Sequence, residues 1–399
     1  MDKLKASWLK SHHCLMAAEA LGNDHIRFVG GAVRNSLMGL PVCDIDAATD
    51  YRPEKAMKLL KAKGFNVIPT GIDHGTVTAI LDGEVIEVTT LRRDVETDGR
   101  RAVVAFTNEW QADAERRDFT INAIYASIDG TLFDPCAGIA DIKEGRIRFI
   151  GSAEERIQED ALRILRLFRF QAHYGRVPLE LDALSAVKKM VVLIDGLSVE
   201  RISGELNKLI LATNPSAVLK IMQELGVLKR CMHNAQIDVQ ALNALIEIEA
   251  NYKTPIKALR RLLALTSCHA SSVLKSWNCS NKAQKHALLC EELMAGLERV
   301  PPTVLEWQKL IYRYNHDVVI DCYLISKRGE HDQGAFESLR DWDIPIFPVA
   351  GADMLRLGHE AGPELGKHLK DLEKQWLQED FGPSQEELLE RLPKVDQHG

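Results

Sequence analysis

The pattern of apolar and polar positions changes near residue 150. Before that point, short runs of β-branched and aromatic residues alternate with turns. One such run, over 76–81, leads into Asp82-Gly83, and a second run follows over 85–90. Two apolar runs joined by Asp-Gly predict a β-hairpin. The first part of the chain is therefore expected to contain a sheet.

Helical spacing of apolar residues, at intervals of three and four, occurs in this first part over 32–38 and 53–63. After residue 150 the same spacing becomes the dominant pattern. Asn214-Pro215-Ser216 and Val300-Pro301-Pro302 interrupt it. The sequence thus predicts an α+β protein, in which a mixed sheet with helices is followed by a long all-helical part.

The composition is that of a soluble globular protein. Apolar residues make up 46% and charged residues 27% of the 399 residues, and the formal net charge is −7. An acidic chain has no overall attraction for nucleic acid, so any RNA-binding surface has to be local. No stretch approaches the roughly 18 apolar residues that a membrane-spanning helix needs.

The eight cysteines are irregularly spaced and form no Cys-x-x-Cys pair. This argues against a zinc site and a disulfide framework, and favours a reducing compartment. The segment 1–21 mixes basic and apolar residues and lacks the features of a signal peptide. We therefore expect a cytoplasmic protein without a membrane partner.

A Gly-Gly turn is the first candidate for chemistry. The predicted strand over 26–29 ends at Gly30-Gly31, and a predicted helix follows. Glycines let the backbone approach a ligand closely, and the amides of such a turn point toward an anion such as a triphosphate. Arg34, on the first turn of the helix, could add a charge-assisted contact.

Asp44 and Asp46 follow this turn and are two residues apart. On a strand, that spacing puts both carboxylates on one face, where they repel each other unless cations lie between them. Mg²⁺ prefers one or two carboxylates together with phosphates, and two such ions can support an in-line displacement at phosphorus. Glu87 is the expected third carboxylate. The alternative is that the two aspartates are ordinary loop acids and that Glu87 is an exposed strand residue.

The block from Gly30 to Arg34, with Asp44-Ile45-Asp46, resembles the first signature of the class II CCA-adding enzymes and bacterial poly(A) polymerases. Both belong to the polymerase-beta nucleotidyltransferase superfamily. Four further blocks follow in that family's order, and they lie at 87–92, 116–123, 134–142 and 159–170. One departure is visible at Asn35, where the family usually has Asp.

The resemblance implies an architecture of four domains: a nucleotidyltransferase head over 1–150, a helical neck over 151–215, a body over 216–305 and a tRNA-binding tail over 306–399. It also implies an activity. CTP and ATP would be added to tRNA 3′ ends as CCA without a template. The 3′ hydroxyl would attack the α-phosphate in line, with two Mg²⁺ ions held by Asp44 and Asp46, and pyrophosphate would leave.

Asp160 and Arg163 are three apart in a predicted helix, so they are expected to share a face. A carboxylate can accept from the amine of cytosine or adenine while a guanidinium donates to the ring, which imitates a Watson–Crick edge. The family resemblance assigns base recognition to the same two positions. It adds Arg117, Arg166 and Arg169 as nucleotide contacts. The alternative is that Asp160 and Arg163 form a surface ion pair.

A polar, charged segment lies between Arg93 and Arg116 and includes Asp94, Asp98 and Arg100. It resembles the flexible loop with which the family switches from CTP to ATP addition. A solvated β-loop is the alternative interpretation.

Three other functions remain open at this level. A relative that adds only A or only C, or a poly(A) polymerase, would share the same catalytic head. The stretch 71–78 looks more like the CCA-adding enzymes, and the chain lacks a long basic extension that would grip generic RNA. A non-catalytic RNA-binding protein is disfavoured because the carboxylates are present. The sequence gives no indication of the oligomeric state.

Overall fold

The computed structural model describes residues 3–98, 101–232, 235–297, 302–326 and 332–393. The chain forms two compact units, 1–234 and 235–399, which are described separately below. The boundary between the units falls inside the stretch expected to be the body. The division into head, neck, body and tail stays a prediction.

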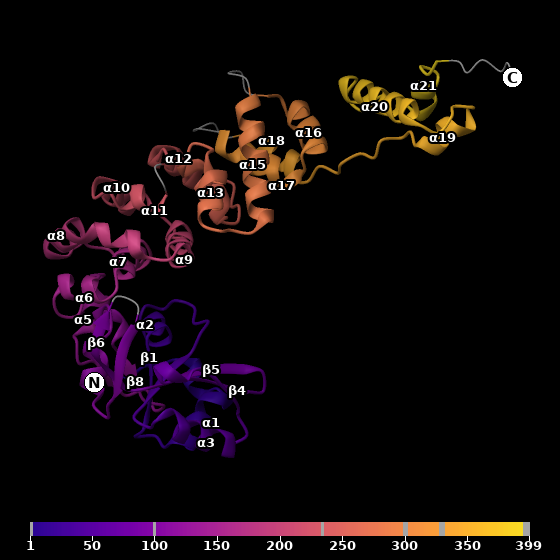
Figure 1. The fold of residues 1–399 in the computed structure, drawn as a ribbon. Coiled ribbons are helices and arrows are strands. Elements are labelled where there is room, and N and C mark those ends of the chain that lie inside the picture. The colour runs from indigo at the N-terminus through magenta and orange to yellow at the C-terminus, as the bar shows by residue number, and fades with distance from the viewer. Residues whose placement is uncertain (1–2, 99–100, 233–234, 298–301, 327–331, 394–399) are drawn as a thin grey trace. The chain divides into compact units, whose positions relative to one another are not determined.

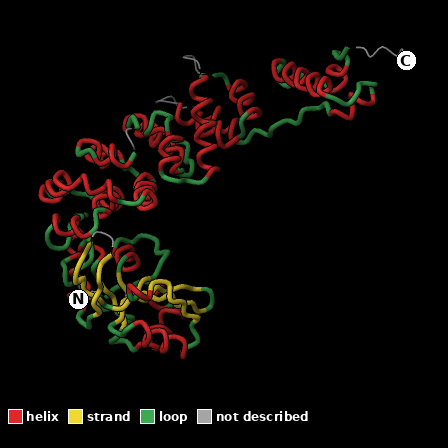
Figure 2. Tube along the Cα trace, viewed as in Figure 1, coloured by secondary structure: helices red, strands yellow, loops and turns green. Residues whose placement is uncertain are grey.

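The first unit contains a seven-stranded mixed sheet, and the yellow strands of Figure 2 all lie in this unit. The strand order is β3-β4-β5-β2-β1-β8-β9, and the β2–β5 pair is parallel whereas the other pairs are antiparallel. The strands are β1 (Ile26–Val29), β2 (Asp46–Thr49), β3 (Asn66–Gly71), β4 (Thr76–Leu81), β5 (Glu84–Thr90), β8 (Tyr125–Ala126) and β9 (Leu132–Phe133).

The predicted hairpin is confirmed as β4 and β5. Asp82 and Gly83 both have positive φ, 53° and 83°, which is the requirement of the two-residue turn that matches strand twist. On the strands, alternate apolar side chains such as Val77 and Val88 are fully buried, and the intervening polar ones face outward. The alternation of apolar and polar residues along these strands therefore places the apolar side chains on one face of the sheet.

Helices α1 and α3 lie beside the sheet (Figure 1). α1 and α3 pack against each other and against strands of the β3–β5 region. The helical segments up to residue 150 are η1 (Ser7–Lys10), α1 (His12–Leu21), α2 (Gly31–Leu37), α3 (Pro53–Ala62), η2 (Ile72–His74), α4 (Trp110–Glu115), η3 (Thr120–Asn122) and α5 (Gly138–Glu144). A separate two-stranded sheet is formed by β6 (Arg92–Asp98) and β7 (Arg101–Phe106).

The rest of the first unit is helical, as predicted. Its longest helix packs against α9, and apolar side chains such as Leu165 and Leu206 are fully buried. These segments are α6 (Ala153–Glu159), α7 (Leu162–Tyr174), α8 (Leu181–Met190), η4 (Val191–Gly196), α9 (Val199–Ile210), α10 (Ser216–Glu224) and α11 (Val227–Cys231).

The second unit contains helices and no strand in its described residues. Buried charges link some of its helices: Arg260 bonds Glu249 at 2.6 Å and Asp321 at 3.1 Å. These helices are α12 (Val239–Asn251), α13 (Ala258–Leu265), α14 (Ala270–Ser276), α15 (Asn281–Gly296), α16 (Val304–Arg313), α17 (His316–Ser326), α18 (Gln333–Arg340), α19 (Gly351–Arg356), α20 (Pro363–Gln378) and α21 (Gln385–Leu389). The predicted α+β class is confirmed.

None of the helices in the described ranges combines the length and the apolarity that a membrane crossing requires. All eight cysteines are free thiols, which agrees with the expectation that the chain has no disulfide framework.

Gly138 offers a test of the contact between α5 and η3. A Cβ at this position would lie 2.2 Å from the carbonyl oxygen of Thr120. Gly138→Ala forces the two backbones apart, and overpacking of this kind costs about 3 kcal/mol. Urea unfolding should show that loss. Gly204→Ala is the matched control, because that site in α9 is open and alanine there stabilises a helix by up to about 1 kcal/mol. Equal midpoints for the two variants would contradict the packing argument.

Candidate active site

A glycine turn opens the site at the end of β1. Gly30 has φ +76°, a conformation that favours glycine, and it directly precedes α2. A Cβ at Gly30 would lie 3.5 Å from Oδ2 of Asp46, so the turn passes beside that carboxylate. The first amides of a helix have no carbonyl partner within it. The turn therefore presents amide donors next to an acidic side chain.

Asp46 and Glu87 are neighbours on adjacent parallel strands. Asp46 begins β2 and pairs in register with Glu87, which lies in the middle of β5 and not at its end. Asp46 is half-buried and Glu87 is exposed. Burial and then the charge of Glu87 raise the pKa of Asp46; Arg117 lowers it, and Asp44 raises it further. The site therefore concentrates negative charge at this sheet position.

The prediction that Asp44 and Asp46 lie on one face of a strand is wrong in one respect. β2 begins only at Asp46, and Asp44 lies in the exposed loop before it. The pairing between β2 and β5 extends only to the hydrogen bond from the Glu87 amide to the Ile45 carbonyl, which is 3.1 Å long. Asp44 therefore lies beyond the paired residues. Asp44 still lies close enough for its charge to act on Asp46.

The carboxylates fit a site for a divalent cation that a phosphate-bearing ligand would complete. Among the residues that the structure describes, no three His, Cys, Asp or Glu side chains enclose a position for a metal ion. Mg²⁺ does not require such a cage, because it commonly takes one or two carboxylates together with phosphates and water. Burial first, and then repulsion from Glu87 and Asp44, raises the pKa of Asp46, and a bound cation would relieve the repulsion.

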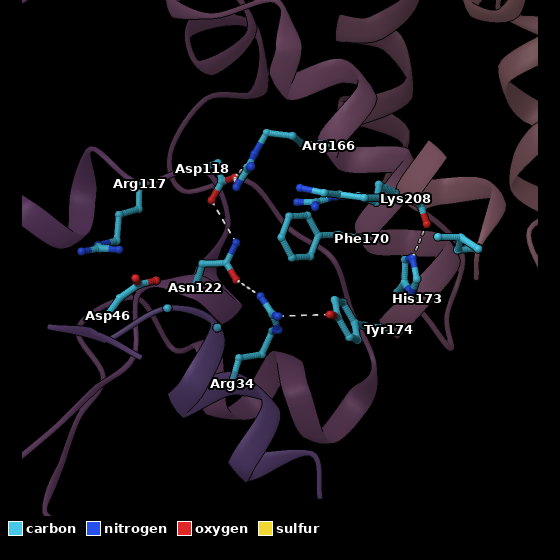
Figure 3. A pocket seen from close by; sticks show the side chains of 14 residues that line it. Arg34, Asp46, Arg117, Asp118, Asn122, Arg166, Phe170, His173, Tyr174 and Lys208 are labelled. Atoms are coloured by element: carbon cyan, nitrogen blue, oxygen red, sulfur yellow. Dashed lines mark hydrogen bonds and ion pairs between the residues drawn. The ribbon is translucent and has the colours of Figure 1, made fainter. Parts of the chain in front are cut away.

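A pocket of about 470 Å³ lies beside Asp46, between the sheet edge and helices α7 and α9 (Figure 3). Its lining combines residues of the first 150 positions with residues of the helical segment. The lining residues are Gly30, Gly31, Arg34, Asp46, Arg117, Asp118, Asn122, Arg166, Arg169, Phe170, His173, Tyr174, Lys208 and Leu211. Of the predicted site residues, the pocket brings together the glycine turn, Asp46 and four arginines. Asp44, Glu87, Asp160 and Arg163 are not part of its lining.

Arg34 is buried at the floor of this pocket. Its Nη1 donates to Asn122 Oδ1 at 2.6 Å, and its Nη2 donates to Tyr174 Oη at 3.1 Å, as the dashed lines of Figure 3 show. Asn35, the position of the departure from the family pattern, accepts from Nε at 3.1 Å and from Nη2 at 2.8 Å. Arg34 thereby connects α2 with α7.

Asp118 is the acidic partner of Arg166. Nε of Arg166 donates to Oδ2 of Asp118 at 2.6 Å, and Asn122 donates to Oδ1 at 3.1 Å. Burial by itself would raise the pKa of Asp118, but the Arg166 guanidinium and the hydrogen bonds from Asn122 and the Phe119 amide hold it below its ordinary value. Asp118 therefore stays ionised and ties α7 to the sheet domain.

Arg169 and Arg117 also line the pocket. Nε of Arg169 lies 2.9 Å from Oε2 of the buried Glu205. Arg117 lies beside Asp46 in Figure 3 and bonds Asp113 at 3.0 Å and the Tyr125 hydroxyl at 3.2 Å. Each of these two arginines is thus held by a carboxylate and also lines the cavity.

Asp160 and Arg163 do not share one helical face, so that prediction is wrong. Asp160 has an extended backbone in the break between α6 and α7. It behaves as a cap for α7, because its Oδ1 accepts from the Leu162 amide at 3.1 Å and its carbonyl accepts from the Arg163 amide at 3.0 Å. Its Oδ2 bonds Arg201 at 2.7 Å. The favourable capping energy of aspartate explains the break.

The surface pair considered as the alternative is also not formed. Arg163 bonds Glu159 instead of Asp160, and its Nη2 reaches the Arg116 carbonyl at 3.3 Å. Burial lowers the pKa of Arg166, but the charges of Asp118, then Glu205 and last Asp160, hold it above its ordinary value. Asp160 itself lies outside the pocket lining.

The predicted flexible loop is a β-hairpin in its described part. Asp94 lies on β6 opposite Val104, and Asp98 lies opposite Arg101. Arg100 lies outside the described residues. The hairpin is compatible with the β-loop interpretation, and the role in switching nucleotides stays a prediction.

Sequence reasoning missed several residues that shape the pocket or fix its arginines, among them Asp118, Asn122, Tyr174, Glu205 and Lys208. A signal existed for the first two, because they stand in the same block as Arg117 at a spacing of four. No comparable signal marks the others, since their role depends on which helix faces the sheet.

Comparison with protein families gives two matches. Residues 26–148 match the model described as "Poly A polymerase head domain". Residues 178–235 match the model described as "Probable RNA and SrmB- binding site of polymerase A". The first match spans the glycine turn and the carboxylates, and the second spans α9.

Curated relatives match over nearly the whole chain. The mouse protein named CCA tRNA nucleotidyltransferase 1, mitochondrial, is 35% identical over 399 residues, covering 97% of this chain and 90% of its own length. The CCA-adding enzyme of Levilactobacillus brevis is 32% identical over 371 residues, covering 87% and 88%. Among solved structures, the Bacillus stearothermophilus CCA-adding enzyme in complex with CTP has a TM-score of 0.77 at 27% identity, covering 94% of this chain and 95% of that one.

The raised pKa of Asp46 predicts a gain in stability when its charge is removed. A carboxyl whose folded-state pKa lies above its unfolded value destabilises the fold when ionised. At pH 7 without divalent cations, Asp46→Asn should unfold at a higher temperature than the natural chain. The difference should shrink as the pH falls through the folded pKa toward the unfolded value of about 3.9.

Asp82→Asn is the matched control, because Asp82 is an exposed turn residue of the same unit and Asn tolerates its positive φ. Adding Mg²⁺ should raise the melting temperature of the natural chain more than that of Asp46→Asn. A melting temperature of Asp46→Asn at or below that of the natural chain, in metal-free buffer at pH 7, would contradict the charge argument.

Proposed function

The chain belongs to the family of CCA-adding tRNA nucleotidyltransferases, and we propose that it adds C, C and A to the 3′ end of tRNA from CTP and ATP without a template. The observation that supports this most is the pocket itself. A half-buried aspartate beside a glycine turn faces four arginines in a cavity of about 470 Å³. Such a cavity suits a nucleoside triphosphate that brings its own cation.

Asp46, Asp44 and Glu87 are the residues that would hold magnesium in this proposal. Asp46 and Glu87 are fixed by the strand pairing, whereas Asp44 lies in a loop and can adjust to the ligand. When bound there, Mg²⁺ would favour deprotonation of the attacking 3′ hydroxyl and neutralise charge on the leaving pyrophosphate. The carboxylates also orient that hydroxyl in line with the α-phosphate.

The triphosphate lies, in this proposal, along the glycine turn. Amides of Gly30 and Gly31 donate to phosphate oxygens, and the guanidinium of Arg34 adds positive charge from below. Arg117, Arg166 and Arg169 complete a ring of donors around the nucleotide. Because each of these three is already held by a carboxylate, little side-chain entropy is lost when the nucleotide binds.

Asp160 and Arg163 read the base in this proposal. Each carboxylate oxygen has two acceptor sites, so Asp160 can accept the amine of cytosine or adenine while it keeps its bonds to Leu162 and Arg201. Uracil and guanine present a carbonyl at the equivalent position. Asp160 would then face another acceptor without a proton between them, which disfavours UTP and GTP.

The proposed partners are tRNA, CTP and ATP, with the tail expected to bind tRNA. The cytoplasmic location expected from the cysteine pattern stays a prediction, since the relatives include proteins named as mitochondrial.

An incorporation assay tests the proposal. Purified chain is given tRNA ending before CCA, in C or in CC, with each NTP alone and with CTP and ATP together. We expect C on the first two substrates and A on the third, with no addition to tRNA that already ends in CCA. Asp46→Asn serves as the inactive control. Absence of C on the first substrate would exclude CCA synthesis, and long A tails on unstructured RNA would indicate a poly(A) polymerase.

Replacing Asp160 tests base recognition. Asp160→Ala removes the acceptor that rejects the carbonyl of uracil, and one such contact is worth about 1–3 kcal/mol. The preference for CTP over UTP, measured as the ratio of kcat/KM values, should therefore fall by about ten- to a hundredfold. Asp182→Ala, at an exposed acid on α8, should leave the ratio unchanged. An unchanged ratio in Asp160→Ala would assign base recognition to other residues.

A further inference from the structure

A row of side chains crosses the sheet from the candidate cation site. Asp46 on β2 pairs in register with Glu87 on β5, and Glu87 pairs with Thr78 on β4. Thr78 in turn pairs with Ile68 on β3. Residues directly opposite each other on neighbouring strands share one face of a sheet. Since neighbouring strands lie about 4.8 Å apart, the row extends about 14 Å from Asp46 to Ile68.

The face that holds this row is exposed, and we call it the open face. It carries Ile68, Thr76, Thr78, Val85, Glu87 and Thr89. The alternate residues of these strands, such as Val77 and Val88, are buried on the other face. Ile68 and Val85 are 42% and 46% exposed. Glu87 is the only acidic residue that β3, β4 and β5, described along their whole length, place on the open face. A polyanion lying there would therefore meet one carboxylate only.

Threonine hydroxyls are the polar groups of the open face. Oγ1 of Thr78 lies 2.7 Å from Oγ1 of Thr70, and Oγ1 of Thr76 lies 3.0 Å from Oγ1 of Thr89. Each of these pairs uses one hydroxyl proton, so the second proton and the remaining lone pairs are available to a ligand. Such hydroxyls can donate to phosphate oxygens and can exchange hydrogen bonds with the 2′-hydroxyl of a ribose.

The geometry of an in-line displacement indicates which substrate lies on this face. The attacking hydroxyl and the leaving pyrophosphate are on opposite sides of the α-phosphate. β2 lies between β1 and β5 in the sheet, so the glycine turn after β1 and Glu87 on β5 flank Asp46 from opposite sides. With the triphosphate along the glycine turn, the attacking 3′ hydroxyl comes from the side of Glu87. β4 and β3 then lie beneath the strand that carries this hydroxyl.

We propose that the open face is the docking surface for the 3′-terminal nucleotides of the RNA acceptor. Thr78, next to Glu87 in the row, bonds the 2′-hydroxyl of the last ribose, and Ile68 lies beneath the nucleotides that precede it. This inference rests on the proposed function, which places the triphosphate and hence the attacking hydroxyl. The occupant is a single-stranded RNA end, recognised by its riboses and phosphates and not by its bases.

Opposite charges at Ile68 test the docking surface. Ile68→Glu places a carboxylate beneath the RNA phosphates and should raise the KM for tRNA ending in CC about five- to tenfold. Ile68→Lys should lower the same KM about two- to fivefold. The difference between the two variants should shrink as the salt concentration rises, because exposed charges are screened. The KM for ATP should be the same in both variants.

Leu15→Glu and Leu15→Lys are the matched controls. Leu15 is 48% exposed on α1, which packs against strands of the β3–β5 region from the side of their buried residues. Both Leu15 variants should leave the KM values for tRNA and ATP unchanged. The proposal fails if Ile68→Glu and Ile68→Lys have the same KM for tRNA, or if the Leu15 pair differs as much as the Ile68 pair.

Thr78→Val tests the contact with the last ribose, because it removes the hydroxyl and keeps the β-branched shape. The natural chain should use tRNA whose last nucleotide is 2′-deoxycytidine about three- to tenfold less well than tRNA ending in cytidine, measured as kcat/KM for A addition. Thr78→Val should use both acceptors equally. Thr213→Val, at an exposed threonine outside the sheet, should keep the natural preference. If Thr78→Val also keeps it, Thr78 does not contact the last ribose.

Filter binding of tRNA ending in CC, without nucleotide, separates this inference from the proposed function. If the natural chain adds no nucleotide but Ile68→Glu still binds tRNA more weakly than Ile68→Lys, the proposed function fails and the docking surface stands. If the natural chain adds CCA while the Ile68 variants have equal Kd and KM for tRNA, the docking surface is wrong and the function stands. Circular dichroism melting of every variant identifies any that has lost its fold.

Discussion

The buried carboxylate of Asp118 is the interaction on which the pocket depends. It accepts from the Phe119 amide, from Asn122 and from Arg166, and so joins the sheet domain to α7 through one ionised group. Asn122, which donates to Asp118, also accepts a hydrogen bond from Arg34 and so fixes the position of Arg34. Loss of Asp118 would remove the nearer of the two acidic partners of the half-buried Arg166 and leave it with Glu205, 3.9 Å away. Asp118 therefore positions Arg166 directly and Arg34 through Asn122.

Local sequence signals predicted the elements that depend on local physics. The hairpin over 76–90 follows from alternating apolar residues and an Asp-Gly turn, and the glycine turn follows from the need for positive φ at Gly30. The apolar spacing of three and four continues across Asp160 and therefore predicts a helix there. The backbone of Asp160 is instead extended. An aspartate directly before Ala-Leu-Arg is a good cap, so capping preference was the signal to weigh against periodicity.

Of the residues that line the pocket, the sequence indicates the glycine turn, Asp46 and the four arginines, but not the residues that support them. Carboxylates and arginines can be found from composition and spacing, together with a family resemblance. Their partners cannot: Arg34 meets Asn122 across 88 residues and Tyr174 across 140, and Arg166 meets Asp118 across 48. Such pairs are decided by how α7 packs on the sheet, and nothing in the local sequence around Tyr174 distinguishes it from any half-buried tyrosine at a helix end.

The pocket contains uncompensated charge of both signs at different ends of the glycine turn. On one side, burial and then the charges of Glu87 and Asp44 raise the pKa of Asp46, and Arg117 offsets this only in part. On the other, Arg34 is buried among neutral acceptors, and its pKa is lowered. Asp46 and Arg34 line the same cavity. A direct ion pair between them would neutralise both charges. Kept apart, they complement a ligand that is itself divided into a cation and a polyanion. A metal–triphosphate complex has this division, because its cation suits the carboxylates and its phosphates suit the arginine. In the proposed function, binding of such a complex would relieve part of the stability cost of these separated charges, which an internally paired site would not have.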